Sequence, residues 1–413
     1  MSLKLLTFNT WGLKYVSKHR QKRLRAIADE LADETKHDYD IVALQEVWCD
    51  EDWDYFTTKC NTRYPYSRRF YAGIIAGPGL CVLSRIPIES TFLYRFPVNG
   101  SPSAFFRGDW YVGKSVGVIK LAPLREGGRP IALLNSHMHA PYALTGSASY
   151  LCHRTCQAWD FAHLAETLRS SGYAVVVVGD LNSRPGTIPY RIFQQIGLLA
   201  DSWELVHGTI DSKVVAQLSP EEQVSSAGTT CDSLLNTWRL NCAPQSAARL
   251  DFALVSADRI KPISAKVVFT TQIPNVGSYS DHFAYATTLE ISNVNPSSNK
   301  IRSFPSSIAA ESALYRDIIA VLDAYQRTWR RQVKWRSLHV FVSILAIIGL
   351  HVSVTLVSFI APWSSVLFLF TTTLITLLAV TNFFIVALFL PSERRNIAEV
   401  RQEVVDRLRL VKE

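Results

Sequence analysis

The chain has 413 residues, of which 48% are hydrophobic and 19% are charged, and its formal net charge is +8. This charge suits either nucleic acid or anionic lipid as a partner, and charge alone does not choose between them. The opening sequence MSLKLLTFNTWG has no basic stretch followed by an apolar core. We therefore expect no signal peptide, and seven reduced cysteines rather than the disulfides of a secreted protein.

Residues 1–292 are predicted to form one α/β domain. Nearly all-apolar runs, typical of strands that are covered on both faces, recur along them, and helical patterns occupy about residues 17–35 and 151–170. The strand-like runs are LKLLTFN, DIVALQE, LCVLSRIPI, VGVIKL, PIALLNSH, AVVVVGDLN, LDFALVS and FAYATTLEI. No Pro/Gly/Ser-rich break divides them, so we expect a single four-layer α/β sandwich with two central mixed sheets.

Polar side chains occur in six clusters where such strands end. Each cluster alone is weak evidence, since a Glu after an apolar strand is ordinarily a solvated strand end. Together they supply oxygen ligands that suit Mg²⁺, two histidines for proton transfer, and carboxylates to orient them. The sequence thus predicts a phosphate-ester active site. The residues are Asn9 in FNTWG, Glu46 in LQEVW, His137 in NSHMHAPY, Asp180 and Asn182 in GDLN, Asp251 in RLDF, and Asp281 and His282 in SDH.

The segment GDWYVGKS at residues 108–115 satisfies the phosphate-binding-loop pattern GxxxxGK[ST]. Such a loop joins a strand to a helix and needs slim, flexible residues around the nucleotide phosphates. This segment instead holds Asp, Trp, Tyr and Val, and it runs into the strand pattern VGVIKL. We therefore expect no nucleotide-binding loop here.

The C-terminal part is predicted to be helical and membrane-spanning. Residues 340–361 and 366–390 contain no Asp, Glu, Lys or Arg, and each stretch is long enough to cross a hydrocarbon core of about 30 Å. Buried helices of a globular domain are the alternative. The expected order is a polar linker at 293–307, an amphipathic basic juxtamembrane helix at 308–336, two transmembrane helices within 338–391, and a cytosolic helix at 392–413.

Basic residues flank the predicted hairpin on both sides. By the positive-inside rule, both flanks and the N-terminal domain should face the cytosol. The endoplasmic reticulum, the Golgi and the mitochondrial outer membrane suit such a hairpin equally, and transmembrane hairpins can pair into homo-oligomers. The flanking residues are Arg327, Arg330, Arg331, Lys334 and Arg336 before the hairpin, and Arg394, Arg395 and Arg401 after it.

The six motifs, in this order, resemble those of the endonuclease/exonuclease/phosphatase superfamily over about residues 1–290. Within it, FNTWGL, GIIAGPGLCVLSRIPI, GDWYVGK, NSHMHAPY and the membrane hairpin resemble the branch of neutral sphingomyelinase and fungal inositol phosphosphingolipid phospholipase C. The resemblance implies a Mg²⁺-dependent enzyme. It would cleave the phosphodiester of sphingomyelin, inositol phosphorylceramide or both into ceramide and a phosphorylated headgroup.

The resemblance also implies roles for the motif residues. Glu46, Asn9 and Asp281 would surround Mg²⁺. His282 would be the general base, held in its tautomer by Asp251, although which histidine is acid and which is base stays open. The remaining roles carried over are Asp180 orienting the water or a histidine, Asn182 and His137 donating to phosphoryl oxygens, His139 contacting the headgroup, and Asp109 and Lys114 forming a regulatory switch.

Alternative functions follow from the same residues. An inositol-phosphate or phosphoinositide phosphatase would be expected to carry more Lys and Arg in its motif loops, and the hairpin argues against a nuclease and against nucleic acid as partner. A catalytically dead membrane adaptor conflicts with the competent residue found at every catalytic position. The branch and the basic juxtamembrane cluster together predict activation by an anionic phospholipid such as phosphatidylserine.

Overall fold

The computed structural model describes residues 2–292 and 308–412, and the chain divides into two compact units. The first unit contains Met1–Asn99 and Asp109–Leu314, and the second contains Gly100–Gly108 and Tyr315–Glu413. The predicted linker at 293–307 lies outside the described residues. No sequence pattern indicated that the nine-residue segment Gly100–Gly108 would group with the C-terminal helices.

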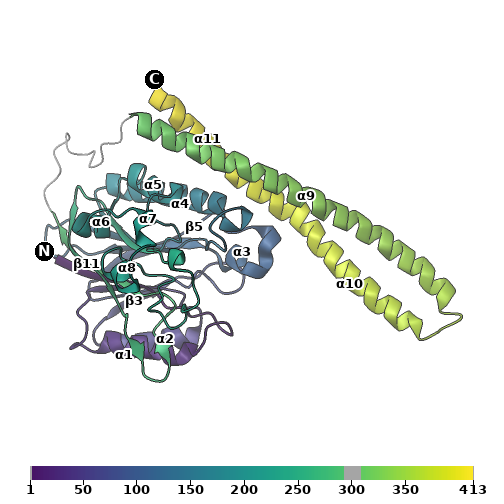
Figure 1. Cartoon of the computed structure of the whole chain (residues 1–413), viewed down its shortest axis with the longest axis horizontal. Coiled ribbons are helices and arrows are strands. Elements are labelled where there is room, and N and C mark those ends of the chain that lie inside the picture. The colour runs from purple at the N-terminus through teal and green to yellow at the C-terminus, as the bar shows by residue number, and fades with distance from the viewer. Residues whose placement is uncertain (1, 293–307, 413) are drawn as a thin grey trace. The chain divides into compact units, whose positions relative to one another are not determined.

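Two six-stranded sheets form the centre of the first unit (Figure 1). Both are mixed, because β1–β2 and β7–β8 pair in parallel while the other neighbours pair antiparallel. The first sheet has the order β11 (Ile260–Val268), β14 (Ala284–Ile291), β1 (Ser2–Asn9), β2 (Ile41–Gln45), β4 (Cys81–Ser84), β3 (Tyr66–Arg69). The second has the order β5 (Ile88–Arg95), β6 (Ser115–Leu121), β7 (Ile131–His137), β8 (Ala174–Asp180), β10 (Asp251–Val255), β9 (Ala200–Asp201).

The two sheets pack face to face through one hydrophobic core. Leu5 and Val82 of the first sheet belong to the same buried cluster as Leu133 and Val176 of the second, and all four are 0% exposed. Burial of an aliphatic side chain of this size contributes roughly 1.5–3 kcal/mol. The strands are nearly all apolar because both faces of each sheet are covered.

Helices cover the outer faces and complete the four predicted layers. α1 (Arg20–Ala32) and α2 (Asp50–Cys60) pack on the first sheet through a second core that includes Leu24, Phe56 and Phe8. α4 (Leu151–Ser170) contacts β8 of the second sheet and packs against α5 (Ile188–Gln195). Shorter elements are α3 (Asp109–Val112), α6 (Ser202–His207), α7 (Ser212–Val215), α8 (Pro220–Ser225), β12 (Gln272–Ile273) and β13 (Gly277–Ser278).

The segment GDWYVGKS is no phosphate-binding loop, as expected. It places the short helix α3 before strand β6, whereas a phosphate-binding loop places a strand before a helix. The predicted helix at 151–170 is confirmed, and the helix predicted at 17–35 is shorter, because it begins after His19 and ends before Asp33. The run LCVLSRIPI contains the whole of β4 and only the start of β5.

The second unit consists mainly of two long helical segments. α9 (Ile308–Val357) runs without a break through the predicted juxtamembrane and first apolar stretches. α10 (Ser364–Phe384) continues through a π-helical turn (Ile385–Phe389) into α11 (Leu390–Lys412). The most apolar 18-residue stretch of the first segment has a mean hydropathy of 2.5, and 6% of it is buried. The corresponding stretch of the second segment has a mean hydropathy of 2.4, and 17% of it is buried. Both are therefore long and apolar enough to cross a membrane.

Polar contacts tie the second unit together. The indole N–H of Trp329 on α9 donates to the carbonyl of Leu390 at 2.9 Å, so α9 lies beside the start of α11. Arg336 donates to the hydroxyl of Ser103 at 2.9 Å and to its carbonyl at 2.8 Å, and also to the side-chain carbonyl of Asn382 at 2.5 Å. One arginine thus joins the Gly100–Gly108 segment to both long helices.

Candidate active site

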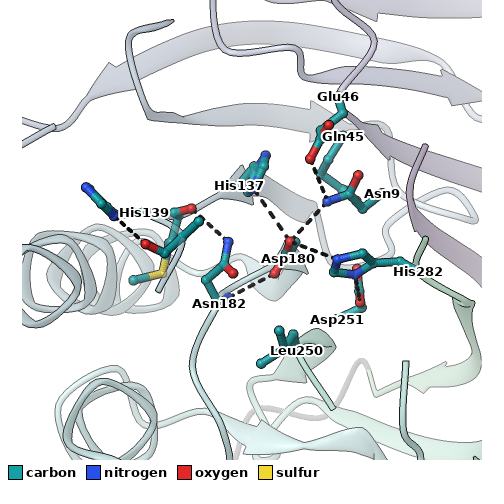
Figure 2. A network of polar contacts seen from close by, with 12 residues as sticks. Asn9, Gln45, Glu46, His137, His139, Asp180, Asn182, Leu250, Asp251 and His282 are labelled. Atoms are coloured by element: carbon teal, nitrogen blue, oxygen red, sulfur yellow. Dashed lines mark hydrogen bonds and ion pairs between the residues drawn. The ribbon is translucent and has the colours of Figure 1, made fainter. Parts of the chain in front are cut away.

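Strand register brings the candidate catalytic residues of the second sheet together. His137 of β7 is paired with Asp180 of β8, and Asp180 is paired with Asp251 of β10. Side chains at the same register position on neighbouring strands point to the same face. On the first sheet, Asn9 and Gln45 end the parallel pair β1 and β2 in the same way, directly before Glu46. Figure 2 shows the side chains from the two sheets converging on one point.

Asp180 lies at the centre of this network (Figure 2). Its carboxylate accepts from the side-chain amide of Asn9 at 3.0 Å and from the backbone N–H of Asn182 at 3.0 Å. The Nε2 atoms of His137 and His282 lie 3.5 and 3.9 Å from it. Burial raises the pKa of Asp180 and outweighs the positive charge of His282, which lowers it, so that the pKa is about 7. A carboxyl that is so buried and so connected can orient both rings.

His282 is held by a buried carboxylate. Its Nδ1 lies 2.8 Å from Oδ2 of Asp251, which is 0% exposed. An ionised carboxylate only accepts hydrogen bonds, so Nδ1 carries the proton and Nε2 faces Asp180. Burial lowers the pKa of His282, but Cys231, Asp251 and Asp180 outweigh it and raise the pKa well above the usual value. The pair has the geometry of a histidine prepared for proton transfer.

His137 has the opposite electrostatic environment. Burial lowers the pKa of this ring far below its usual value, and the positive charges of Lys114 and His282 lower it further. Its ring is therefore neutral at neutral pH, only 3.5 Å from Asp180. The two histidines that the sequence singled out thus flank one carboxylate in different protonation states, which is how acid and base roles are separated.

Glu46 and Asp281 form an acidic pair that suits a divalent cation. Burial and the negative charge of Asp281 together raise the pKa of Glu46. One carboxylate oxygen of Glu46 accepts from Asn9 at 3.1 Å, while Oε2 is buried without a hydrogen-bond partner in the described part of the chain. Buried carboxylates in this state are compensated by a metal ion or by protonation. The donor set fits Mg²⁺, which usually keeps several waters beside one or two carboxylates.

The remaining details of this acidic pair restrict how a cation is held. Asp281 also accepts from Arg239 at 2.6 Å. The amide oxygen of Asn9 accepts from the backbone N–H of Trp11 at 3.1 Å, so its nitrogen, rather than its oxygen, faces the carboxylates. Within residues 2–292 and 308–412, no group of three or more His, Cys, Asp or Glu side chains converges in metal-binding geometry. A cation here would therefore complete its coordination with water and substrate.

Asn182 and His139 are turned partly into the protein. The side-chain amide of Asn182 donates to the carbonyl of Met138 at 3.0 Å, and the residue has a positive φ of 48°. His139 is 1% exposed and stacks on Tyr150 with ring centroids 4.3 Å apart. Burial lowers the pKa of His139 to about 3, so its ring is neutral. In this arrangement, His139 supports the neighbouring loop.

Asp109 and Lys114 form an ion pair that is buried, which distinguishes it from an ordinary ion pair at a strand edge. Their closest atoms are 3.4 Å apart, and the side chains are only 7% and 4% exposed. The hydroxyl of Tyr142 donates to Asp109 at 2.7 Å, and Nε2 of His139 lies 3.9 Å from the same carboxylate. Burial raises the pKa of Asp109, but His139, Lys114 and Tyr142 outweigh it and lower the pKa.

Several residues that position the site escaped sequence reasoning. Gln45 donates to Asn135 at 2.7 Å and so links the two sheets beneath the catalytic residues. Asn135 could have been found, because it lies two residues before His137 and hence on the same strand face. Arg23 is 0% exposed and donates to four backbone carbonyls, those of Thr10, Trp11 and Lys18 in the first motif loop and that of Tyr279. An arginine in an ordinary basic helix gives no sequence signal of that role.

Residues 6–282 match the Endonuclease/Exonuclease/phosphatase family, and the chain therefore belongs to this family. The branch follows from curated relatives. The chain is 48% identical to the inositol phosphosphingolipids phospholipase C of Saccharomyces cerevisiae over 98% of this chain and 90% of that protein. It is 38% identical to the Schizosaccharomyces pombe protein of the same name, over 94% and 89%. It is 32% identical to human sphingomyelin phosphodiesterase 2, over 72% and 67%.

Solved structures share the fold at low sequence identity. The crystal structure of SmcL superposes with a TM-score of 0.53 at 16% identity, over 70% of this chain and 99% of that one. Sphingomyelinase C from Streptomyces griseocarneus gives 0.52 at 20% identity, over 70% and 99%. A Staphylococcus aureus beta toxin variant with bound magnesium ions gives 0.52 at 16% identity, over 70% and 99%. These likenesses confirm the predicted α/β sandwich.

Proposed function

We propose that this protein is a membrane-anchored, Mg²⁺-dependent phospholipase C that hydrolyses the phosphodiester of sphingolipids to ceramide and a phosphorylated headgroup. The observation that carries the proposal is the convergence of Glu46, His137, Asp180 and His282 around one point in a fold of the endonuclease/exonuclease/phosphatase family. The names of the relatives that match 98% and 94% of the chain support a phosphoric diester hydrolase. They also favour phosphoinositol over phosphocholine as the headgroup.

The proposed reaction needs charge neutralisation at the phosphoryl group, a general base for the attacking water, and a proton for the leaving oxygen. Mg²⁺, held by Glu46 and Asp281 with Asn9 orienting them, would neutralise charge on a non-bridging phosphoryl oxygen. His282 takes a proton from the attacking water at Nε2, while Asp251 fixes its tautomer and stabilises the imidazolium that forms. The water oxygen bonds to phosphorus as the bond to the ceramide oxygen breaks.

Proton supply to the leaving ceramide oxygen completes the reaction. His137, on the other side of Asp180, would protonate the leaving ceramide oxygen, while Asn182 would donate a hydrogen bond to a phosphoryl oxygen as charge develops there. The family resemblance assigns the base to His282 and the acid to His137, whereas the raised pKa of His282 and the lowered pKa of His137 favour the reverse order. Separate pH profiles of kcat for His282→Gln and His137→Gln test it, since removal of the base abolishes the acidic limb and removal of the acid the alkaline limb.

Membrane anchoring places the enzyme at its substrate. The two apolar helices would span the bilayer with both basic flanks and the catalytic domain on the cytosolic side, in the endoplasmic reticulum, Golgi or mitochondrial outer membrane. Their exposed apolar faces are available for pairing with a second copy. The Asp109–Lys114 pair would act as a regulatory switch. Its burial and the hydrogen bond from Tyr142 to Asp109 support this role.

Phosphatidylserine is the proposed activator, and the second unit offers a place for its headgroup. A pocket of about 150 Å³ lies between α9 and α11, lined by Trp329, Arg330, Arg394 and Arg401 among others. The guanidinium of Arg394 lies 5.1 Å from the Trp329 ring centroid, while Arg401 is paired with Asp323 at 2.8 Å. Basic pockets at the cytosolic ends of transmembrane helices suit anionic headgroups.

The deciding experiment measures Mg²⁺-dependent hydrolysis by the purified full chain. Sphingomyelin and inositol phosphorylceramide are presented in mixed micelles with phosphatidylserine, with Glu46→Ala and His282→Ala as controls. Ceramide release that is lost in both variants is the expected result, and the ratio between the two lipids identifies the headgroup. Activity on soluble inositol phosphates without ceramide release would instead support the phosphatase, and a function kept by Glu46→Ala would support the adaptor.

A further inference from the structure

Large apolar side chains gather on three loops of the first unit. Within residues 2–99 and 109–292 of this unit, five such side chains are more than 65% exposed. All five lie in the loops at residues 10–19, 70–80 and 138–150, rather than on the outer strands or helices. Isolated exposed apolar residues are ordinary, but confinement to three loops is not. The residues are Tyr15, Val16, Ile74, Ile75 and Leu144.

Each of these loops adjoins the candidate active site. The 10–19 loop leaves Asn9, whose side-chain oxygen accepts from the backbone N–H of Trp11 at 3.1 Å. The 70–80 loop returns beside the second motif, where the carbonyl of Gly79 accepts from the N–H of Val47 at 3.0 Å. The 138–150 loop leaves β7 directly after His137. The exposed apolar side chains therefore border the edge of the sandwich at which the substrate must enter.

Two of the three loops, at residues 70–80 and 138–150, are held in place by contacts with α3. The backbone N–H of Ile74 donates to the carbonyl of Tyr111 on α3 at 2.8 Å. Gly73 has a φ of +77° and approaches the end of α3 so closely that a Cβ there would lie 2.5 Å from the carbonyl oxygen of Val112. On the other loop, Tyr142 donates to Asp109 at 2.7 Å. The 70–80 and 138–150 loops thus both contact α3.

Exposed lysines accompany the apolar side chains. Lys14, Lys18 and Lys22 are all exposed, and Nζ of Lys14 lies 5.5 Å from the ring centroid of Tyr15. Apolar and aromatic side chains interleaved with lysines are typical of surfaces that lie in a membrane interface, where the apolar groups enter the acyl boundary and the cations contact anionic headgroups. A surface that binds another protein would not need apolar side chains interleaved with lysines next to an active site for a lipid.

We propose that these three loops form an interfacial surface through which the catalytic unit docks on the lipid bilayer. The inference rests on the proposed function, because only a membrane-lipid substrate requires the active-site edge to reach headgroup depth. The transmembrane hairpin keeps the enzyme at the membrane, and the loops orient the site toward the scissile phosphodiester. Tyr15, Ile74, Ile75 and Leu144 enter the interface, and the lysines contact lipid phosphates.

Photo-crosslinking tests the surface without relying on activity. Benzoylphenylalanine is placed at Ile75 or Leu144 of the full chain in proteoliposomes that contain phosphatidylserine, with Ile263 of β11, which is 51% exposed, as the matched control. We expect lipid adducts at the two loop positions at least about tenfold above the control. Equal yields at Ile75 and Ile263 would overturn the proposal, whether or not the protein hydrolyses sphingolipids.

Paired kinetic assays test what docking does. Ile74→Ser combined with Ile75→Ser should lower hydrolysis of bilayer-embedded sphingolipid by about tenfold or more, since two buried aliphatic side chains are lost from the interface. The rate on a water-soluble nitrophenyl phosphodiester should stay within about twofold of wild type, and Ile263→Ser should change neither rate. A parallel loss on the soluble substrate, or an equal bilayer defect in Ile263→Ser, would contradict the docking role. Crosslinks without activity on any phosphodiester would refute only the proposed reaction.

Discussion

Replacement of Asp251 by Asn examines the core of the proposed chemistry, because it keeps the shape of the side chain and removes its charge. In the wild type, Asp251 is 0% exposed and lies 2.8 Å from Nδ1 of His282. The carboxamide can present its NH₂ group to the ring, which moves the ring proton to Nε2, where the proton from water must be accepted. In a serine-protease triad, the equivalent loss lowers kcat by about 10⁴-fold, or roughly 5.4 kcal/mol in the barrier.

The assay compares kcat/KM of wild type and Asp251→Asn on inositol phosphorylceramide in mixed micelles at saturating Mg²⁺. Asp258→Asn is the matched control, since Asp258 is a buried carboxylate of the same unit that pairs with Arg169 and lies outside the site. We expect a loss of about 10³–10⁴-fold for Asp251→Asn and less than about threefold for the control. The pKa of His282, which Asp251 helps to raise, should also fall in an NMR titration of the variant. A loss below tenfold, or equal losses in both variants, would refute the reasoning.

Three further predictions concern the metal, the activator and acid stability. Glu46→Gln should abolish the Mg²⁺-induced rise in Tm. It should also raise Tm in chelator at pH 7–8, because burial raises the pKa of this carboxyl in the folded protein, and such a group costs stability at pH values above its unfolded pKa. Arg330→Gln with Arg394→Gln should weaken phosphatidylserine activation about 10–30-fold at unchanged basal rate, whereas Arg409→Gln, 70% exposed on α11, should not. Two cationic partners lower the pKa of Asp38 to about 2, so its contribution to stability is present above about pH 4 and is lost as pH falls through about 2. Asp38→Asn should therefore flatten the acid limb of the unfolding profile, and an unchanged profile would contradict that assignment.

The strands and the main helices could be predicted because their signals are local. Apolar runs of strand length gave the core of both sheets, and α4 was located to the residue. β3 and β11 were missed, since the exposed and half-buried residues of YSRR and IKPISAKVV make no continuous apolar run. The continuity of α9 across the predicted juxtamembrane boundary also escaped, because a change from amphipathic to apolar composition does not end a helix.

In the candidate active site, too, local motifs identified the chemical candidates but not all of their partners. GDLN, SDH and LQEVW identified Asp180, His282 and Glu46 as chemical candidates, since each places a functional side chain where an apolar strand leaves the core. The family resemblance supplied the Asp251–His282 partnership, but other partners could not be assigned, and Arg239, which donates to Asp281 at 2.6 Å, lies in a loop without any motif. The assigned roles remain predictions until the variants are measured.

The sequence by itself determined most of the strands of both sheets, the main helices, the two apolar spans and the chemical types available for catalysis, because periodicity, hydropathy and ligand chemistry depend on neighbouring residues. Only the tertiary structure decided that His137, Asp180 and Asp251 stand in one register, that Asp109 and Lys114 are buried together, and that Gly100–Gly108 groups with the C-terminal helices. These relations join residues far apart in the chain. Strand pairing and side-chain packing set them, and neither is visible in a local pattern.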